Sequence, residues 1–313
     1  EYLFVGPNES IQFSTGSADY DGAKMSLRDA DNIASQDLVS ETGVSGQPGD
    51  YALDFTSAPG TGIAEEGIWY GPFARVGRDE SLPDIDGLSS VTMQGWFKAS
   101  EGFVPTGNME FIKNASNSPS PGGGFMLKAV NNGALRLYIN GEGSAVDAIS
   151  ENKDWATTGE WVFFAVTYDG LATENNVNFY VGGIDQPVTL SSTQTLDQGL
   201  INDDDNRLSI SRNTRPFKGL LDNIRIYGSI ADSSGVLSQD QLEAVRVGDG
   251  GNPATAKWAG YDIVDGYVNT EGWLGWMFVE NTPWVFNLPL SNWIYLPEDS
   301  AASEAGSWIY LSR

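Results

Sequence analysis

Two clusters of aspartate have the residue types that bind a hard cation. Asp203 and Asp205 belong to the acidic run Asp203-Asp204-Asp205-Asn206, and Asp19 and Asp21 flank a tyrosine just before a glycine. Calcium takes six to eight oxygen ligands, which a carboxylate-rich loop can supply together with its carbonyl groups. The sequence therefore offers these four aspartates as ligands of Ca²⁺. The alternatives are a solvated acidic loop and an ordinary Asx turn.

A second group of residues has the chemistry of sugar recognition. Trp69, Tyr70 and Trp155 fall in segments predicted as loops, where an aromatic ring can stack on the apolar face of a sugar. Asn213 and Arg215 lie in another predicted loop, and their planar polar groups suit hydrogen bonds to hydroxyl groups. These five are the predicted carbohydrate-binding residues. The alternative for each aromatic ring is that it covers the edge of the core.

The composition limits the catalytic chemistry that is available. The chain of 313 residues contains no histidine and no cysteine. Ser-His and Cys-His nucleophile pairs, disulfides and the usual zinc ligand sets are therefore excluded. Catalysis would have to rest on carboxylates, tyrosine or lysine.

The charge balance limits the partners. Lys and Arg total 17 against 42 Asp and Glu, which gives a net charge of −25. A field of that sign repels phosphate backbones and anionic lipid heads but attracts cations, so we expect no nucleic-acid partner and consider Ca²⁺. The alternative is that the charge only keeps the protein in solution. No apolar run reaches the roughly 18 residues that cross a bilayer, so no membrane insertion is predicted.

Short strand-like runs bounded by Gly, Pro, Asn or Asp recur between residues 51 and 227. Many short strands with turn-rich connections are typical of an all-β sandwich or barrel rather than of βαβ units. The run from Trp161 to Tyr168 is almost continuously apolar, which predicts burial on both faces. One helix is predicted after Ser238, because Ser238 and Gln241 form a capping-box pattern. The predicted strands are 51–55, 91–97, 110–113, 124–129, 134–139, 161–168, 177–181, 208–211 and 220–227.

A Gly-rich stretch at 248–253 is predicted to be a linker between a domain of residues 1–247 and a domain of residues 254–313. Six of the ten tryptophans follow residue 257, and Asn292-Trp-Ile-Tyr-Leu296 is nearly repeated as Ser307-Trp-Ile-Tyr-Leu311. This pattern predicts a small Trp-rich β-hairpin module at the C-terminus. We expect its tryptophans to build the core, because so small a module lacks disulfides. The alternative is an aromatic platform for polysaccharide or cell wall.

Six motifs follow one another in a recognisable order. They are Gly49–Phe55, Val91–Phe97, Gly133–Asn140, Glu160–Gly170, Val177–Gly183 and Phe217–Tyr227, the last followed by Leu237–Leu242. In type and order they resemble the laminin-G-like branch of the concanavalin A-like lectin/glucanase superfamily, over residues 49–247. The resemblance implies an all-β fold, a two-sheet antiparallel jelly-roll sandwich. It places these residues in or near the core: Trp96, Trp161, Phe163, Val166, Tyr168, Phe179, Ile224 and Ile226.

The same resemblance makes Asp222 a ligand of a structural calcium near the N-terminal segment. The alternative pairs Asp222 with Arg225 or lets it cap a turn. Glycanases of this superfamily carry a strand motif, E-x-D-x-(x)-E, that sets carboxylates on one face for hydrolysis. No such motif occurs in this sequence, so a non-catalytic protein is favoured.

The sequence thus favours a secreted, non-catalytic, lectin-like module with a structural Ca²⁺, acting outside the cell or on its surface on a polysaccharide or glycoconjugate. A second hypothesis is an adhesion or structural domain that contacts a cell-surface protein or the envelope without a sugar site. A third is a glycan-active hydrolase or lyase. An exposed aromatic groove would favour the first, a flat apolar patch on the C-terminal module the second, and two carboxylates about 5–10 Å apart the third.

Overall fold

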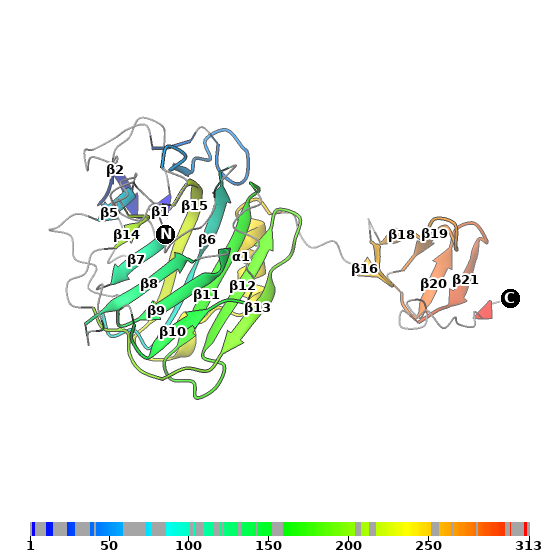
Figure 1. The fold of residues 1–313 in the computed structure, drawn as a ribbon. Helices are drawn as coiled ribbons and strands as arrows, with labels where there is room; N and C mark the ends of the chain where they lie inside the picture. The colour runs from blue at the N-terminus through cyan, green and yellow to red at the C-terminus, as the bar shows by residue number, and fades with distance from the viewer. Residues whose placement is uncertain are drawn as a thin grey trace. The chain divides into compact units, whose positions relative to one another are not determined.

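The computed structural model divides the chain into two compact units, residues 1–252 and 253–313, which are drawn in Figure 1. Each unit is described by itself. The structure describes residues 2–3, 11–14, 24–28, 38–40, 42–58, 73–76, 86–100, 103, 109–115, 119, 122–130, 133–141, 143–151, 159–203, 208–212, 217–251, 257–263, 266–279, 281–297, 301 and 310–311.

The first unit is a sandwich of two antiparallel sheets (Figure 1). One sheet has nine strands in the order β1 (Tyr2–Leu3), β2 (Ile11–Ser14), β3 (Lys24–Arg28), β5 (Phe73–Val76), β14 (Ser209–Ile210), β7 (Met109–Ala115), β8 (Gly124–Ala129), β9 (Leu135–Ile139) and β10 (Val146–Ile149). The other has six strands in the order β13 (Thr189–Gln194), β12 (Val177–Gly183), β11 (Val162–Asp169), β6 (Ser90–Ala99), β15 (Gly219–Ser229) and β4 (Leu53–Asp54). The predicted all-β, two-sheet sandwich is confirmed.

The core between the sheets follows from alternation along the strands. In β8, Phe125, Leu127 and Ala129 face the main hydrophobic cluster, while Met126 and Lys128 alternate with them on the other face. Aromatic rings fill the centre, where Phe97 and Phe111 contact each other and both contact Phe164 and Phe217. The core positions expected from the family pattern are confirmed: six are fully buried, and Trp161 and Ile226 are half-buried against the hydrophobic clusters.

Helix α1 (Gln239–Gly248) covers the outer face of the six-stranded sheet. Its Leu242 belongs to a second hydrophobic cluster with Trp96 and Phe163 of strands β6 and β11. This explains why residues 162–168 of β11 are buried on both faces, as their apolar run predicts. The predicted capping box is present: the Ser238 side chain accepts a hydrogen bond from the Gln241 amide, and the Gln241 side chain accepts one from the Ser238 amide. A 3₁₀ turn, η4 (Ser233–Gly235), precedes the helix.

The stretch predicted as a linker begins inside the sandwich unit. Gly248 is the last residue of α1, and Asp249 is buried. The Asp249 carboxylate accepts a hydrogen bond of 3.0 Å from the Trp96 indole and forms a bidentate ion pair with Arg225 at 2.7 Å. These three hydrogen bonds to the Asp249 carboxylate hold the start of the glycine-rich stretch in place, although its composition predicts a flexible linker. No helix within the described part of the chain is long and apolar enough to span a bilayer.

The second unit contains a two-stranded ribbon and a five-stranded antiparallel sheet. The ribbon pairs β16 (Lys257–Trp258) with β17 (Tyr261–Asp262). The sheet runs in chain order through β18 (Tyr267–Asn269), β19 (Trp276–Phe278), β20 (Trp284–Asn287), β21 (Asn292–Tyr295) and β22 (Tyr310–Leu311).

The expectation that tryptophans build the core of this unit is wrong for most of those described. Trp258 is buried, but Trp273, Trp276, Trp284 and Trp293 are exposed. The reason is the phase of the alternation in strands β18 to β21: Val268, Met277, Val285 and Ile294 point inward, and their flanking residues, aromatic except for Asn269, point outward. The buried cluster is Trp258, Val268, Met277, Val279, Val285, Ile294 and Leu296.

Candidate functional site

Asp222 lies where strand β15 is irregular. The pairing of β15 with β6 shifts register between Asp222 and Arg225, and Asn223 takes a left-handed backbone conformation with φ of 49°. The side chain of Asp222 is 2% exposed. Its two carboxylate oxygens accept hydrogen bonds from the amides of Val44, at 2.8 Å, and Asn223, at 2.7 Å. The bulge thus aims a buried carboxylate at the segment around residue 44.

A second carboxylate, Asp50, meets Asp222 on either side of Gly43. A Cβ atom on Gly43 would lie 2.5 Å from Oδ2 of Asp222 and 2.7 Å from Oδ1 of Asp50. The two oxygens are therefore at most 5.2 Å apart, because their separation cannot exceed the sum of their distances from this Cβ position. Oδ2 of Asp50 accepts hydrogen bonds from the Ser45 amide, at 2.8 Å, and hydroxyl, at 2.6 Å. Only glycine fits between these two side chains.

The electrostatics of this pair disfavour two negative charges. The pKa of the Asp222 carboxyl is raised from 3.8 to about 7, chiefly by burial; the charges of Asp50 and Asp249 contribute to the rise, and the Val44 and Asn223 amides oppose it. A cation between the carboxylates would relieve this repulsion.

The fit of this pair to calcium rests on its donor atoms. Asp222 and Asp50 supply carboxylate oxygens, the ligand type that Ca²⁺ prefers. The bidentate partner of Arg225 is Asp249, whereas the backbone amides of Val44 and Asn223 donate to the Asp222 carboxylate. Within the part of the chain that the structure describes, no group of three or more His, Cys, Asp or Glu side chains is placed to hold a metal. Among the described residues, two carboxylates are thus the acidic part of such a site, and backbone carbonyls or water would add further ligands.

Of the other predicted calcium ligands, Asp203 is described. Its Oδ2 accepts a hydrogen bond of 2.9 Å from the Asn114 amide group, and its backbone amide donates to Oδ1 of Asp86 at 2.8 Å. Asn114 lies in strand β7 of the nine-stranded sheet and Asp86 precedes strand β6, so neither contact brings Asp203 to Asp222. The remaining predicted ligands and all the predicted sugar-binding residues lie outside the described residues: Asp19, Asp21, Asp205, Trp69, Tyr70, Trp155, Asn213 and Arg215.

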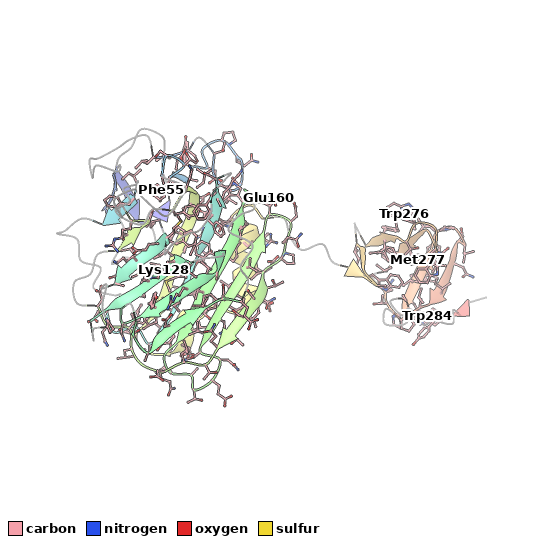
Figure 2. All side chains as sticks on the ribbon, in the orientation of Figure 1. Phe55, Lys128, Glu160, Trp276, Met277 and Trp284 are labelled. Carbon is pink, nitrogen blue, oxygen red and sulfur yellow. The ribbon has the colours of Figure 1, made fainter. Side chains whose placement is uncertain are left out.

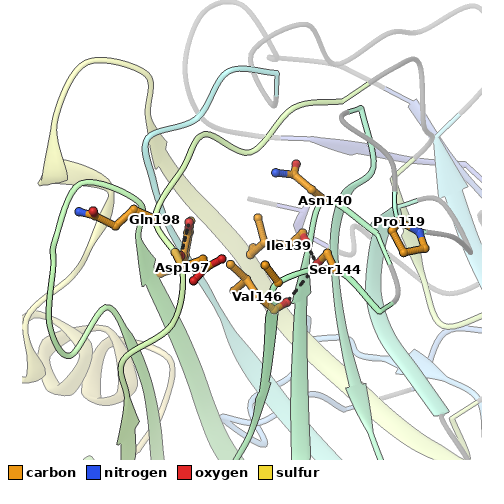
Figure 3. A pocket seen from close by; sticks show the side chains of 9 residues that line it. Pro119, Ile139, Asn140, Ser144, Val146, Asp197 and Gln198 are labelled. Atoms are coloured by element: carbon orange, nitrogen blue, oxygen red, sulfur yellow. Dashed lines mark hydrogen bonds between the residues drawn. The ribbon is translucent and has the colours of Figure 1, made fainter.

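A pocket of about 410 Å³ opens at one end of the sandwich (Figure 3). Asp197 and Gln198 form one wall, Asn140 and Ser144 the other, and Ile139 and Val146 lie between them (Figure 3). Its lining is completed by Pro119, Ala145 and Tyr168. The volume falls in the range of small-molecule sites, and the mixture of an apolar floor with polar walls is typical of them.

Residues 196–202, the segment that carries the lining residues Asp197 and Gln198, are fixed by side chains from three other segments. The Asn176 amide group donates to the Leu196 carbonyl at 3.0 Å and accepts from the Leu196 amide at 2.8 Å. The Tyr168 hydroxyl donates to the Gly199 carbonyl at 3.0 Å. Asn140, in a left-handed conformation with φ of 58°, holds Leu200 and Asn202. A loop held at so many points forms the pocket before any ligand arrives.

The groups that face the pocket can both donate and accept hydrogen bonds. The carboxylate of Asp197 makes no hydrogen bond to another described residue, and the Gln198 side-chain amide donates to the Leu171 carbonyl at 2.9 Å while its oxygen can still accept. The Ser144 hydroxyl is bonded to the carbonyls of Ile139 and Val146 and can accept a further bond (Figure 3). The pKa of the Tyr168 hydroxyl is raised to about 12, chiefly by burial and also by the charges of Asp169 and Asp197, so the hydroxyl stays a donor.

A laminin-G sequence profile, described as that of the Concanavalin A-like lectin/glucanases superfamily, matches residues 78–236, just over half of the chain. The chain belongs to the concanavalin A-like lectin/glucanases superfamily. The matched range includes Asp222 and the whole pocket, whereas Gly43 and Asp50 precede it. No curated protein sequence matches this superfamily member.

Solved structures with a similar fold have low sequence identity to this superfamily member. Domain 4 of AbnA, a GH43 extracellular arabinanase from Geobacillus stearothermophilus in complex with arabinotriose, has 16% identity and a TM-score of 0.44, covering 71% of this chain and 87% of its own. Botulinum neurotoxin type C, whose cell entry depends on two ganglioside molecules, has 14% identity and a TM-score of 0.49 over 79% of this chain and 50% of its own. A SAP-like pentraxin from Limulus polyphemus has 13% identity and a TM-score of 0.34, over 50% of this chain and 70% of its own.

Proposed function

We propose that the protein binds carbohydrate without cleaving it, through the pocket between the β9–β10 turn and residues 196–199. The observation that carries this proposal is the pre-formed pocket itself, with polar walls of Asp197, Gln198 and Ser144 around an apolar floor. A sugar ring has the matching chemistry, because it presents hydroxyl groups at its rim and C–H groups on its faces.

Each part of the pocket has a role in this proposal. The Asp197 carboxylate accepts hydrogen bonds from two adjacent hydroxyl groups of the sugar. Hydrogen bonds to an ionised acceptor are stronger than those between neutral groups. Gln198 and Ser144 set the orientation of the ring, while Pro119 and Val146 contact its C–H face. Glycoside hydrolysis uses two carboxyl groups flanking one bond. Among the described residues that line the pocket, Asp197 is the single carboxylate, which supports binding over cleavage.

A structural Ca²⁺ at the Asp50–Asp222 pair is part of the proposal. Asp50, Asp222 and backbone carbonyls of the 43–50 segment would hold it, and its charge would stabilise two carboxylates that otherwise repel each other. By fastening this segment to strand β15 it would support the sandwich rather than touch the sugar. We propose a secreted or cell-surface setting, where polysaccharides and glycoconjugates are the available partners.

A glycan array with the full chain tests the proposal. The array carries neutral and acidic oligosaccharides. It is run in about 2 mM Ca²⁺, a concentration at which weak extracellular calcium sites fill, and again in EDTA. We expect binding that falls at least tenfold in Asp197→Ala and Gln198→Ala, with Asp240→Ala, an exposed acid in helix α1, as the matched control. Binding unchanged in both pocket variants would refute the assignment of this pocket.

A further inference from the structure

One face of the C-terminal sheet consists almost entirely of aromatic side chains. In paired antiparallel strands, residues opposite each other lie on the same face, and every second residue of a strand shares it. The pairs Tyr267 with Phe278, Phe278 with Phe286, and Phe286 with Trp293 therefore form one row across strands β18 to β21. Trp276 and the pair of Trp284 with Tyr295 extend the same face. Of eight outward-facing positions in these strands, seven are aromatic and the eighth is Asn269.

The opposite face of the sheet already supplies the core of the unit. Val268, Met277, Val285 and Ile294 are each 0% exposed. In contrast, Trp276 is 49% exposed and Trp284 is 44% exposed. Met277, the residue after Trp276, lies inside the unit (Figure 2). Large aromatic rings gain most from burial, so several of them held in solvent on one face mark a surface that binds something.

The rings of this face are fixed by contacts between neighbouring strands. Ring centroids are 5.1 Å apart for Tyr267 and Phe278, 5.2 Å for Trp284 and Tyr295, and 5.4 Å for Phe286 and Trp293. Because each ring is braced by another, little rotamer entropy remains to be lost on binding. The four-strand row crosses three strand spacings of about 4.8 Å, or roughly 14 Å.

The face is also electrically neutral in a strongly acidic protein. Strands β18 to β21 contain no Asp, Glu, Lys or Arg, although the chain carries a net charge of −25 and residues 254–313 contain seven acids and two bases. A partner with negative charge would be repelled by the protein as a whole, and two copies of the chain would repel each other. A neutral partner meets neither penalty.

We infer that this face, which we call the aromatic face, is a second binding site, for a neutral polysaccharide whose sugar rings stack on the row of aromatic side chains. The C–H faces of a sugar carry partial positive charge and match the negative faces of aromatic rings. A row of braced rings about 14 Å long suits an extended chain of several sugars rather than a single one. The inference shares with the proposed function the idea of a glycan ligand, but it rests on different residues in the other unit.

Affinity electrophoresis of the full chain tests the inference, with hydroxyethyl cellulose, galactomannan and arabinoxylan as neutral probes and alginate as an anionic one. In the first variant Trp276, Trp284 and Trp293 are all replaced by leucine, which keeps apolar bulk and removes the flat rings. In the second all three are replaced by tyrosine. Trp273→Leu is the matched control, since Trp273 is 46% exposed but lies in the turn between β18 and β19.

We expect retardation by at least one neutral probe, in 0.5 M NaCl with EDTA, because stacking needs neither charge nor calcium. The triple leucine variant should bind at least tenfold more weakly, which equals about 1.4 kcal/mol, whereas the tyrosine variant should stay within about threefold of wild type. An unchanged circular dichroism spectrum verifies folding, and the tyrosine variant keeps the test valid if leucine disturbs the sheet.

Each of the following results would overturn the inference. The first is equal retardation of the leucine variant and wild type. The second is preference for alginate, or no retardation by any neutral probe. The third is a concentration-dependent dimer in sedimentation velocity that the leucine variant loses, which would make the aromatic face a contact between copies. The Asp197→Ala variant separates the two sites: if it alone abolishes glycan binding, the proposed function stands and this inference falls.

Discussion

Replacement of Asp222 by asparagine should remove the pH dependence of stability that this carboxyl imposes. Its pKa is raised from 3.8 to about 7, so between these pH values the folded state holds a proton that the unfolded state has lost. Stability from this group is therefore complete below pH 3.8 and is lost as the pH rises to about 7. Since each pKa unit corresponds to about 1.36 kcal/mol, the full effect on the free energy of unfolding is about 4 kcal/mol.

The asparagine variant lacks this titration but has a defect of its own. One oxygen of Asp222 becomes an NH₂ group that faces the amide of Val44 or Asn223, and an unsatisfied buried donor costs about 1–3 kcal/mol. We expect Asp222→Asn to be less stable than wild type at pH 4 and equal to it or more stable at pH 8.

Urea unfolding of both proteins from pH 4 to pH 8 in EDTA measures this difference. The difference in unfolding free energy between wild type and variant should change by about 3–4 kcal/mol over that range. A constant difference would refute the reasoning, because it would mean that Asp222 is not a buried carboxyl with a raised pKa. Adding Ca²⁺ at pH 8 to a hundred times its Kd should stabilise wild type by about 2.7 kcal/mol and leave the variant unchanged.

Three further variants test the packing that supports both units. Gly43→Ala places a methyl group 2.5 Å from Asp222 and should lower the unfolding free energy by about 1–3 kcal/mol in urea and abolish the calcium effect; an unaltered midpoint would contradict the close approach of the two carboxylates. Asp249→Ala removes the partner of Trp96 and Arg225 and should cost about 3–5 kcal/mol, a loss that Asp249→Asn should partly restore; equal stability of wild type and the alanine variant would show that the helix end is not anchored there. Met277→Ala opens a cavity worth about 2–5 kcal/mol and should expose residues 253–313 to proteolysis while the sandwich resists; cleavage at the wild-type rate would contradict the core assigned to this unit.

The strands with strong local patterns could be predicted from the sequence. Strand β11 was expected from its apolar run and helix α1 from its capping box, because both signals lie within a few neighbouring residues. Strand β13 was not predicted, since Thr189–Gln194 is polar and mostly exposed and forms a strand only by pairing with β12 at the sheet edge. Edge strands of this kind depend on their neighbours more than on their own residues.

The candidate site was less predictable because it depends on contacts between distant segments. The family pattern identified Asp222, but nothing local to either residue indicates that Asp50 meets it across Gly43. The pocket likewise joins the turn after Ile139 to Asp197 through the tethers of Asn140 and Tyr168. Short sequence motifs do not predict such contacts between distant segments, because the order of the strands in the sheets determines them.

The aromatic face could have been predicted from the strand pattern of the C-terminal unit, in place of a tryptophan core. The repeated Trp-Ile-Tyr pattern places Trp and Tyr on one side of a strand and Ile on the other. The expectation of a tryptophan core gave the larger rings to the inside, but Val285 and Ile294 fill it instead. The prediction assumed that so small a unit without disulfides needs its tryptophans for a core, whereas Val268, Met277, Val285 and Ile294 supply that core together with one tryptophan, Trp258.

The most direct test of the central claim is a titration of the full chain with the oligosaccharide that gives the strongest array signal, followed by mass spectrometry of the sugar. The account predicts saturable binding that Asp197→Ala weakens at least tenfold, with the oligosaccharide recovered intact. Absence of binding to every array glycan would contradict the claim and favour an adhesion domain without a sugar site. Release of shortened oligosaccharides would contradict it in the other direction, because it would make the protein a glycan-cleaving enzyme.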